Sequence, residues 1–170
     1  MKESPSEQVR RLVAGAIESL ETQGVHDEAL GILREPRGFS VFKTAPIIRP
    51  AGRAWRLGVL LVDRSGGVYA TGDVTRAIEP LRAVTNRSAE AEARRDDRRA
   101  AARGRFAEGE VVNHRFVALS LDDESLHAGS GPLEVQDGLV VVHWDRTSAG
   151  RGVATLDRYL ADRVSVLTID

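Results

Sequence analysis

Apolar residues recur every three to four positions near the N-terminus, which is the spacing of one face of a helix. The residues of this stripe are Val9, Leu12, Val13, Ala16, Ile17 and Leu20. Ser4, Pro5 and Glu7 precede it in the order of an N-cap, a first-turn proline and a capping-box acid. The sequence therefore predicts an amphipathic N-terminal helix that ends at Gly24.

A shorter apolar segment begins after Asp27 and ends before Pro36. Its apolar residues are Ala29, Leu30, Ile32 and Leu33. This spacing predicts a second, short helix. The period then changes, so residues 39–42 predict a short strand, and Pro46 and Pro50 make its continuation irregular or edge-like.

The most apolar stretch of the chain runs from Gly52 to Val74 and is interrupted once, by Arg64-Ser65-Gly66-Gly67. Its first arm, 55–62, is apolar on both faces, whereas the second arm, 68–75, alternates between apolar and polar positions. Ser-Gly-Gly supplies the positive-φ positions of a tight turn. We therefore predict a β-hairpin over about 52–75 whose first arm belongs to the core and does not line a functional site.

The C-terminal half predicts further strands. Residues 111–119 are rich in strand-forming residues, and 121–127 predict a short helical turn ended by Gly129. Asp137-Gly138 lies between two apolar runs, which is a strong signal for a second hairpin over about 133–144.

Two more helices are predicted. Ser88 can cap a charged surface helix over about 88–103, whose apolar residues are almost all alanine. Thr155 can cap a C-terminal helix, and residues 164–169 predict a final strand. Short linkers are predicted only over 44–52 and 148–153. The pattern as a whole predicts a single α+β domain over 1–170, with a largely antiparallel sheet built from the two hairpins and packed by the N-terminal helix.

Composition narrows the class of protein. The chain carries 24 basic and 25 acidic side chains, and this near balance does not favour a dedicated nucleic-acid or membrane-surface protein. The absence of cysteine excludes disulfides, thiolate catalysis and cysteine-ligated metals. No apolar run approaches the ~20 residues that cross a bilayer, and the polar N-terminus lacks the apolar region of a signal peptide. We therefore expect a soluble cytoplasmic protein with no membrane partner.

One short motif raises the question of catalysis. Ser40 and Lys43 fit Ser-x-x-Lys, in which one helical turn places an amine beside a hydroxyl to act as its base. The flanking residues indicate an extended backbone, on which the two side chains would point to opposite faces. Asp63 and Asp73 flank the first hairpin turn, but nothing in the sequence places either beside a second carboxylate for acid–base work.

Histidines are the candidate metal ligands. His114 and His143 lie on predicted strands and could share a sheet face, with His127 or Asp145 nearby, an arrangement that suits zinc. No ligand spacing links them, however. The prediction is therefore that the protein holds no metal and no other cofactor, with His114 and His143 as the candidates if a metal is bound.

The arginine-rich helix is the candidate anion-binding surface. The residues that could cover consecutive phosphates are Arg94, Arg95, Arg98, Arg99 and Arg103. Acidic residues in the same helix compensate much of this charge, and no aromatic residue between Tyr69 and Phe106 can stack on a base. A salt-bridged solvated face is favoured, and nucleic acid is not a favoured partner.

Three segments carry a family resemblance: GRAWRLGVLLVDRSGGVYATGDVTRAIEP at 52–80, GEVVN at 109–113 and AGSGPL at 128–133. Together they resemble a small family of uncharacterised proteins from high-GC bacteria to which the label glutaminase is often attached. The resemblance covers most of the chain from about Ala51 onward and, more loosely, the N-terminal helix. It implies bacterial origin and, through the label, amide hydrolysis.

The leading expectation for function is a binding or self-association module, including a homodimer, with no demonstrable active site. One alternative is a glutaminase-like amide hydrolase that uses Ser40 and Lys43, and another is arginine-mediated binding of nucleic acid or anions. Whether the protein is an enzyme, which small molecule it binds, its sheet order and its oligomeric state are left open by the sequence.

Overall fold

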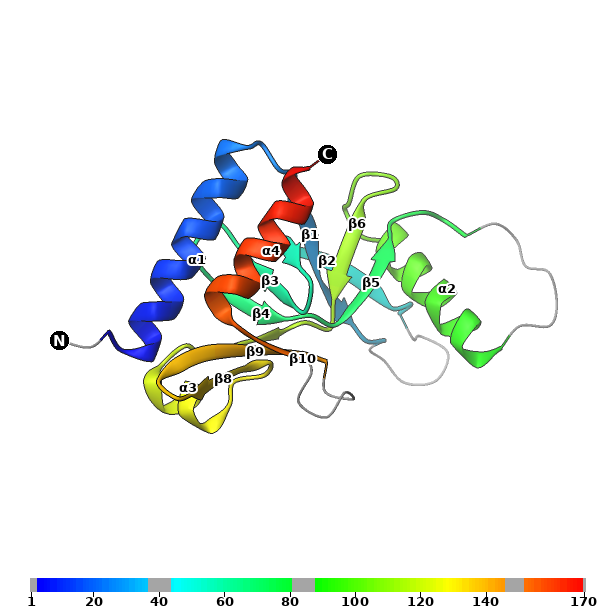
Figure 1. Ribbon diagram of the computed structural model, residues 1–170. Helices are drawn as coiled ribbons and strands as arrows, with labels where there is room; N and C mark the ends of the chain where they lie inside the picture. Colours follow the sequence, from blue (N-terminus) through cyan, green and yellow to red (C-terminus); the bar gives the residue numbers. More distant parts are fainter. Residues whose placement is uncertain (1–2, 37–43, 81–87, 146–151, 170) are drawn as a thin grey trace. The chain divides into compact units, whose positions relative to one another are not determined.

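The computed structural model describes residues 3–36, 44–80, 88–145 and 152–169 (Figure 1). The chain forms two compact units, between which it passes several times. Unit 1 comprises Met1–Asp27, Trp55–Thr71 and Val117–Asp170, and unit 2 comprises Glu28–Ala54 and Gly72–Phe116. The described part contains four helices and ten strands, and the strands pair antiparallel except for one parallel pair, β1 with β6, as the predicted α+β class requires. None of its helices combines the length and the apolar content needed to cross a membrane.

The two long helices of unit 1 are α1 (Pro5–Thr22) and α4 (Leu156–Thr168), which lie side by side (Figure 1). The predicted capping box is confirmed, because the Glu7 amide donates to Ser4 Oγ and the Ser4 amide donates to the Glu7 carboxylate. The strand predicted over 164–169 is wrong. Val164 continues the apolar face of α4 and is buried, so the helix extends to Thr168.

Three short strands and the end of a fourth form the first sheet segment of unit 1. They are the last three residues of β2 (Ile47–Leu57), β3 (Leu60–Val62), β4 (Val68–Ala70) and β7 (Val117–Ala118). The single predicted arm over 55–62 is wrong, because the chain reverses at Gly58, whose φ is +64°, and β3 pairs back onto β2. The turn over 64–67 is confirmed between β3 and β4.

A separate three-stranded sheet completes unit 1, in the order β10-β9-β8. Its strands are β8 (Leu133–Gln136), β9 (Leu139–Asp145) and β10 (Gly152–Thr155). The predicted hairpin is confirmed, since Asp137 and Gly138 both have positive φ between β8 and β9. The short helix α3 (Asp123–Ala128) ends at Gly129 as predicted. The linker predicted over 148–153 is wrong at its C-terminal end, because β10 begins at Gly152.

The central apolar stretch is core, as predicted. Trp55, Leu57, Leu60 and Val62 are all buried together with the inner faces of α1 and α4. The indole Nε1 of Trp55 donates to the carbonyl of Val25 at 2.8 Å, so its one polar group is satisfied inside the core. These four residues are scaffold. Gly58 and Val59 of the same arm, however, line a pocket described below, which departs from the prediction that the arm lines no functional site.

The described residues of unit 2 form four paired strands in the order β5-β6-β1-β2 and one helix. The elements introduced here are β1 (Glu28–Arg34), β5 (Asp73–Arg76), β6 (Val111–His114) and α2 (Ala89–Ala102). The helix predicted after Asp27 is wrong. The apolar run is too short to decide between helix and strand by itself, and it pairs on both sides as β1, between β2 and β6.

Three boundaries in unit 2 differ from the predictions. The linker predicted over 44–52 is wrong because β2 begins at Ile47, and Pro50 is accommodated opposite Gly31 where the register with β1 shifts. The strand predicted over 111–119 is interrupted at Arg115, whose φ is +55°. The hairpin predicted over 52–75 does not include β5, which pairs with β6. The strand predicted over 39–42 lies outside the described residues.

The charged helix forms as predicted, and the Ser88 hydroxyl caps it by accepting from the Ala91 amide. Its small buried face of Ala100 and Ala101 belongs to a core with Ile48 and Val112. The second core is built mostly from alanine and is much smaller than that of unit 1.

Candidate functional site

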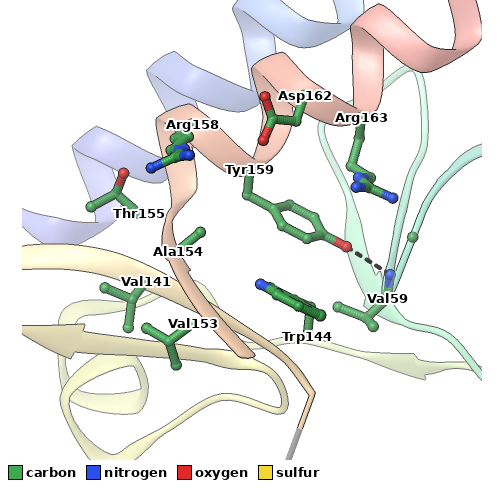
Figure 2. Close-up of a pocket in the computed structure, with 11 residues that line it drawn as sticks. Val59, Val141, Trp144, Val153, Ala154, Thr155, Arg158, Tyr159, Asp162 and Arg163 are labelled. Carbon is green, nitrogen blue, oxygen red and sulfur yellow. Dashed lines mark hydrogen bonds between the residues drawn. The ribbon is translucent and has the colours of Figure 1, made fainter. Parts of the chain in front are cut away.

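A pocket of about 730 Å³ opens in unit 1 between the turn after β2, strands β9 and β10, and helix α4 (Figure 2). We call it the Trp144 pocket. Its apolar wall consists of Val59, Val141, Trp144, Val153 and Ala154. The Trp144 side chain projects from β9 and leaves the residue 49% exposed, whereas Trp55 is buried. An indole that is half open to solvent inside a concave surface is an apolar face available to a ligand.

Tyr159 holds one side of this pocket in place. Its hydroxyl donates to the Leu57 carbonyl at 2.9 Å and accepts from the Val59 amide at 2.8 Å, so it ties α4 to the turn between β2 and β3 (Figure 2). Burial raises the pKa of the Tyr159 phenol, although the Val59 amide and the nearby arginines Arg163 and Arg56 act against this. The phenol therefore stays protonated and serves as a fixed part of the wall.

Charged side chains of α4 complete the pocket. Arg158, Asp162 and Arg163 line it, and the two arginines lie on either side of Tyr159 (Figure 2). The guanidinium carbon of Arg163 lies 5.6 Å from the centre of the Tyr159 ring. Within the described part of the chain, Arg158 has no carboxylate within ion-pair distance. The three charges leave this lining with one net positive charge.

A second group of polar side chains lies in unit 2. Asp73 on β5, Asp97 on α2 and His114 on β6 each place a possible ligand atom within 4.8 Å of the other two. We call this group the Asp–His cluster. Asp73 and His114 are directly opposite each other in the β5–β6 pair, so both side chains project from the same face of the strands. The sequence alone placed no second carboxylate beside Asp73, whereas the structure brings Asp97 close to it.

Arg115 joins the two carboxylates of the cluster. Its guanidinium donates to Asp73 Oδ2 at 2.7 Å and to both carboxylate oxygens of Asp97 at 3.2 Å. His114 is completely buried, and its Nε2 lies 3.8 Å from Asp97 Oδ2. Burial lowers the pKa of His114, as does Arg115, and this outweighs the opposite influence of the two carboxylates. The imidazole is therefore neutral at neutral pH.

The other histidine candidate lies elsewhere. His143 is on β9 in the three-stranded sheet, so it does not share a sheet face with His114 on β6. Its Nε2 lies 2.8 Å from Glu134 Oε2, and this contact lowers the pKa of the Glu134 carboxyl. His127 Nδ1 lies 2.7 Å from the Asp123 carbonyl oxygen. The structure thus does not bring the histidines together, and Ser40 and Lys43 lie outside the described residues.

The arginine candidates of α2 do not form one uniform exposed surface. Arg95 is only 4% exposed, so its guanidinium does not belong to an outer anion-binding face. Arg99 forms ion pairs with Glu92 and Asp96, and Arg103 donates to the Pro46 carbonyl. The two remaining candidates, Arg94 and Arg98, line a pocket together with Arg95, Ala91 and residues 78–80.

Sequence reasoning singled out His114 as a candidate ligand and considered Asp73 without finding it a partner, and it identified no residue of the Trp144 pocket as part of a site. Trp144 and Arg158 belong to elements that were predicted, but the pocket arises only from the way β9, β10 and α4 pack against one another. Asp97 is one of the acidic residues of α2, which were interpreted together from the sequence as part of a salt-bridged solvated face. No family model, curated protein or solved structure matches this chain. The resemblance to the glutaminase-labelled family therefore stays a prediction, and a functional hypothesis depends on the geometry of these sites alone.

Proposed function

We propose that this chain is a binding protein for a small ligand that combines a planar apolar body with an anionic group, and that the ligand occupies the Trp144 pocket. The observation that carries the proposal is the half-exposed indole of Trp144 in a concave surface that also presents Arg158 without an ion-pair partner among the described residues. The sequence led us to expect a binding module, and the proposal adds the location of its site and the chemical class of its ligand.

The size and apolar lining of the pocket support a small molecule. Ligand sites typically enclose ~300–1,000 Å³ and combine apolar walls with a few polar groups, and the Trp144 pocket, at about 730 Å³, lies within that range. A planar ligand that covers the exposed face of Trp144 would remove apolar surface of both partners from water, and aromatic pairs add a favourable geometric contribution. Val59 lies beside the indole (Figure 2), and Val141 and Val153 line the same pocket and would extend the apolar contact.

The charge of the lining supports an anionic group. A guanidinium offers several donors in a planar arrangement, which matches the oxygens of a carboxylate, sulfonate or phosphate. Arg158 would gain such a partner at little cost, because no ion pair with a described residue has to be broken first. Arg163 already lies against Tyr159, so it would add mainly long-range attraction.

The pocket is also held open before any ligand arrives. The bridge from the Tyr159 hydroxyl to Leu57 and Val59 fixes α4 relative to the turn that forms the opposite wall. A wall that is already ordered reduces the entropy that binding would otherwise lose.

The probe that matches this chemistry is 1-anilinonaphthalene-8-sulfonate, an aromatic anion whose fluorescence rises in an apolar environment. We expect it to bind the folded full chain and to quench the fluorescence of Trp144. Arg158→Gln should weaken binding by about tenfold or more, because a hydrogen bond to a charged group contributes ~1.5–3 kcal/mol and ~1.4 kcal/mol corresponds to a factor of ten. Trp144→Ala should abolish the rise in probe fluorescence. The matched control is Arg49→Gln, which removes an exposed arginine of unit 2.

The uncharged analogue N-phenyl-1-naphthylamine separates the two parts of the proposal. It should bind more weakly than the sulfonate to the native chain and about equally well to the native and Arg158→Gln chains. Cooperative thermal unfolding of each variant shows that the probe reports a folded pocket. Sulfonate binding that is unchanged by both Trp144→Ala and Arg158→Gln would refute the proposal.

A self-association role predicts a different outcome for the same residue. If Trp144 pairs two chains, the molar mass measured by light scattering should rise with protein concentration and fall to that of a monomer in Trp144→Ala. The amide-hydrolase and nucleic-acid hypotheses stay predictions, with no observation in the described residues that favours either over ligand binding.

A further inference from the structure

The Asp–His cluster gathers three metal-ligating side chains from three elements of unit 2. The register of β5 with β6 places Asp73 opposite His114, and α2 supplies Asp97. Two ligand atoms bound to one zinc ion at ~2.0–2.2 Å are at most ~4.4 Å apart, and the three ligand atoms here lie within 4.8 Å of one another. Small side-chain rotations would therefore bring all three into one coordination shell.

His114 adds an observation that is independent of the carboxylates. The residue is 0% exposed, and neither of its ring nitrogens has a hydrogen-bond partner among the described residues. Buried polar atoms in folded proteins are nearly always satisfied, because an unsatisfied one loses its hydration without replacement. The 3.8 Å from Nε2 to Asp97 Oδ2 is too long for a hydrogen bond, so the ring nitrogen is directed at an acid without bonding to it.

We propose that Asp73, Asp97 and His114 together bind one divalent first-row transition-metal ion, with Zn²⁺ bound more tightly than Mn²⁺. One imidazole nitrogen and two carboxylate oxygens form a ligand set of intermediate softness, which suits these ions better than it suits Ca²⁺ or Cu⁺. The order of the two ions follows the general series of affinities for nitrogen and oxygen ligands. The proposal does not rest on the Trp144 pocket, whose lining belongs entirely to unit 1.

Arg115 is the competitor that a metal ion would have to displace. Its side chain is 46% exposed, so its guanidinium can turn out into water when a cation takes the carboxylates. The two carboxylates carry two negative charges, of which Arg115 compensates one, whereas a divalent ion compensates both. Exchange of the guanidinium for the ion would also satisfy a ring nitrogen of His114, which Arg115 does not.

The test uses the full chain freed of metal by a chelator. Zn²⁺ is titrated against a chromophoric competitor, and Co²⁺ is followed by its visible absorption, which reports a nitrogen-containing, low-symmetry site. We expect one ion per chain. Asp73→Asn and Asp97→Asn should each weaken binding by more than about tenfold, because even outer-shell partners of a metal contribute ~10–100-fold. His143→Gln removes a histidine outside the cluster and should leave the affinity unchanged.

Arg115→Gln provides the discriminating result. If the guanidinium competes with the ion, its removal should tighten Zn²⁺ binding severalfold, whereas a cluster that exists only to hold Arg115 should bind no metal in either chain. Asp73 is 59% exposed, so Asp73→Asn is the variant that most safely keeps the fold. If other variants unfold, the NMR signals of the His114 ring in the native chain should shift on addition of Zn²⁺. Binding that is insensitive to Asp73→Asn, or no tighter in a folded Arg115→Gln chain, would overturn the proposal.

Discussion

The two hydrogen bonds made by the Tyr159 hydroxyl can be tested directly by a single substitution in unit 1. Tyr159→Phe keeps the ring and removes only the oxygen, so the Val59 amide loses its partner and the Leu57 carbonyl loses one donor. The hydroxyl bond to Leu57 is buried, and that to Val59 is partly buried. A buried group left unsatisfied costs ~1–3 kcal/mol, and since water can reach Val59 we expect a total loss of about 2 kcal/mol.

Urea unfolding followed by the fluorescence of buried Trp55 measures this loss. With a slope of ~1–3 kcal/mol per molar urea for a small protein, the midpoint should fall by about 1 M while the slope stays unchanged. Tyr69→Phe is the matched control, because the Tyr69 hydroxyl donates to Asp63 Oδ2 in a partly buried site that water can enter. A buried hydrogen bond to a charged carboxylate would contribute ~1.5–3 kcal/mol. Water can replace the hydroxyl in this partly buried site, so the Tyr69→Phe chain should lose no more than about 1 kcal/mol.

The comparison of the two tyrosine variants tests whether the Tyr159 bridge holds α4 to the β2–β3 turn. A Tyr159→Phe chain as stable as the native chain, or one destabilised no more than Tyr69→Phe, would mean that the bridge does not hold α4 to the β2–β3 turn. The claim that the wall of the Trp144 pocket is already ordered would then lose its support. A change in the slope would instead indicate an altered unfolded or native state, in which case the two free energies could not be compared.

Three further outcomes follow from local geometry. Ser4→Ala should lower the unfolding free energy by about 1 kcal/mol in urea denaturation, because it removes the N-cap acceptor of α1. Gly58→Ala should destabilise by more than Gly66→Ala in thermal unfolding: both positions have positive φ, which costs a residue with a Cβ ~1–2 kcal/mol, but only at Gly58 would the new Cβ collide with Tyr159. Burial alone would raise the pKa of Asp63, yet hydrogen bonds from Ser65, Tyr69 and Gly67 lower it below its ordinary 3.8. The ionised form is therefore favoured by folding, so its stabilising effect is complete above the unfolded pKa and is lost as the pH falls through the folded pKa. The difference in unfolding free energy between native and Asp63→Asn chains should shrink as the pH drops below 3.8, and a constant difference would contradict this.

Elements with local signals were predictable from the sequence. The capping box at Ser4 and the Asp137-Gly138 turn each combine a backbone requirement with the residue types that satisfy it, so the N-terminal helix and the second hairpin were predicted correctly. Segment 28–34 was not, because its identity as a strand comes from its neighbours β2 and β6 and not from its own short pattern. The reversal at Gly58 was hidden for a related reason: one glycine in an apolar run does not distinguish a strand interior from a turn.

The candidate sites were less predictable than the fold because each depends on pairing between distant segments. Trp144 was assigned to a strand correctly, but nothing in its own segment shows that β10 and α4 leave a pocket beside it. His114 was identified as a candidate ligand for its residue type alone, and it was combined with the wrong partner, His143. The actual neighbours are carboxylates, and the sequence showed these only as turn and surface acids.

The position of the Asp–His cluster depends on the register of a single strand pair. Asp73 begins β5 and His114 ends β6, so the cluster forms at the last rung of their ladder. A slip by one residue would turn Asp73 to the opposite face and leave His114 facing a different neighbour. Gly72 lies against this rung, where an added Cβ would collide with the backbone of Arg115 and His114. The close approach that Gly72 allows therefore helps to set the register that brings the His114 imidazole next to Asp73. This requirement involves β5, β6 and α2, which are far apart in the sequence, so no short motif reveals it.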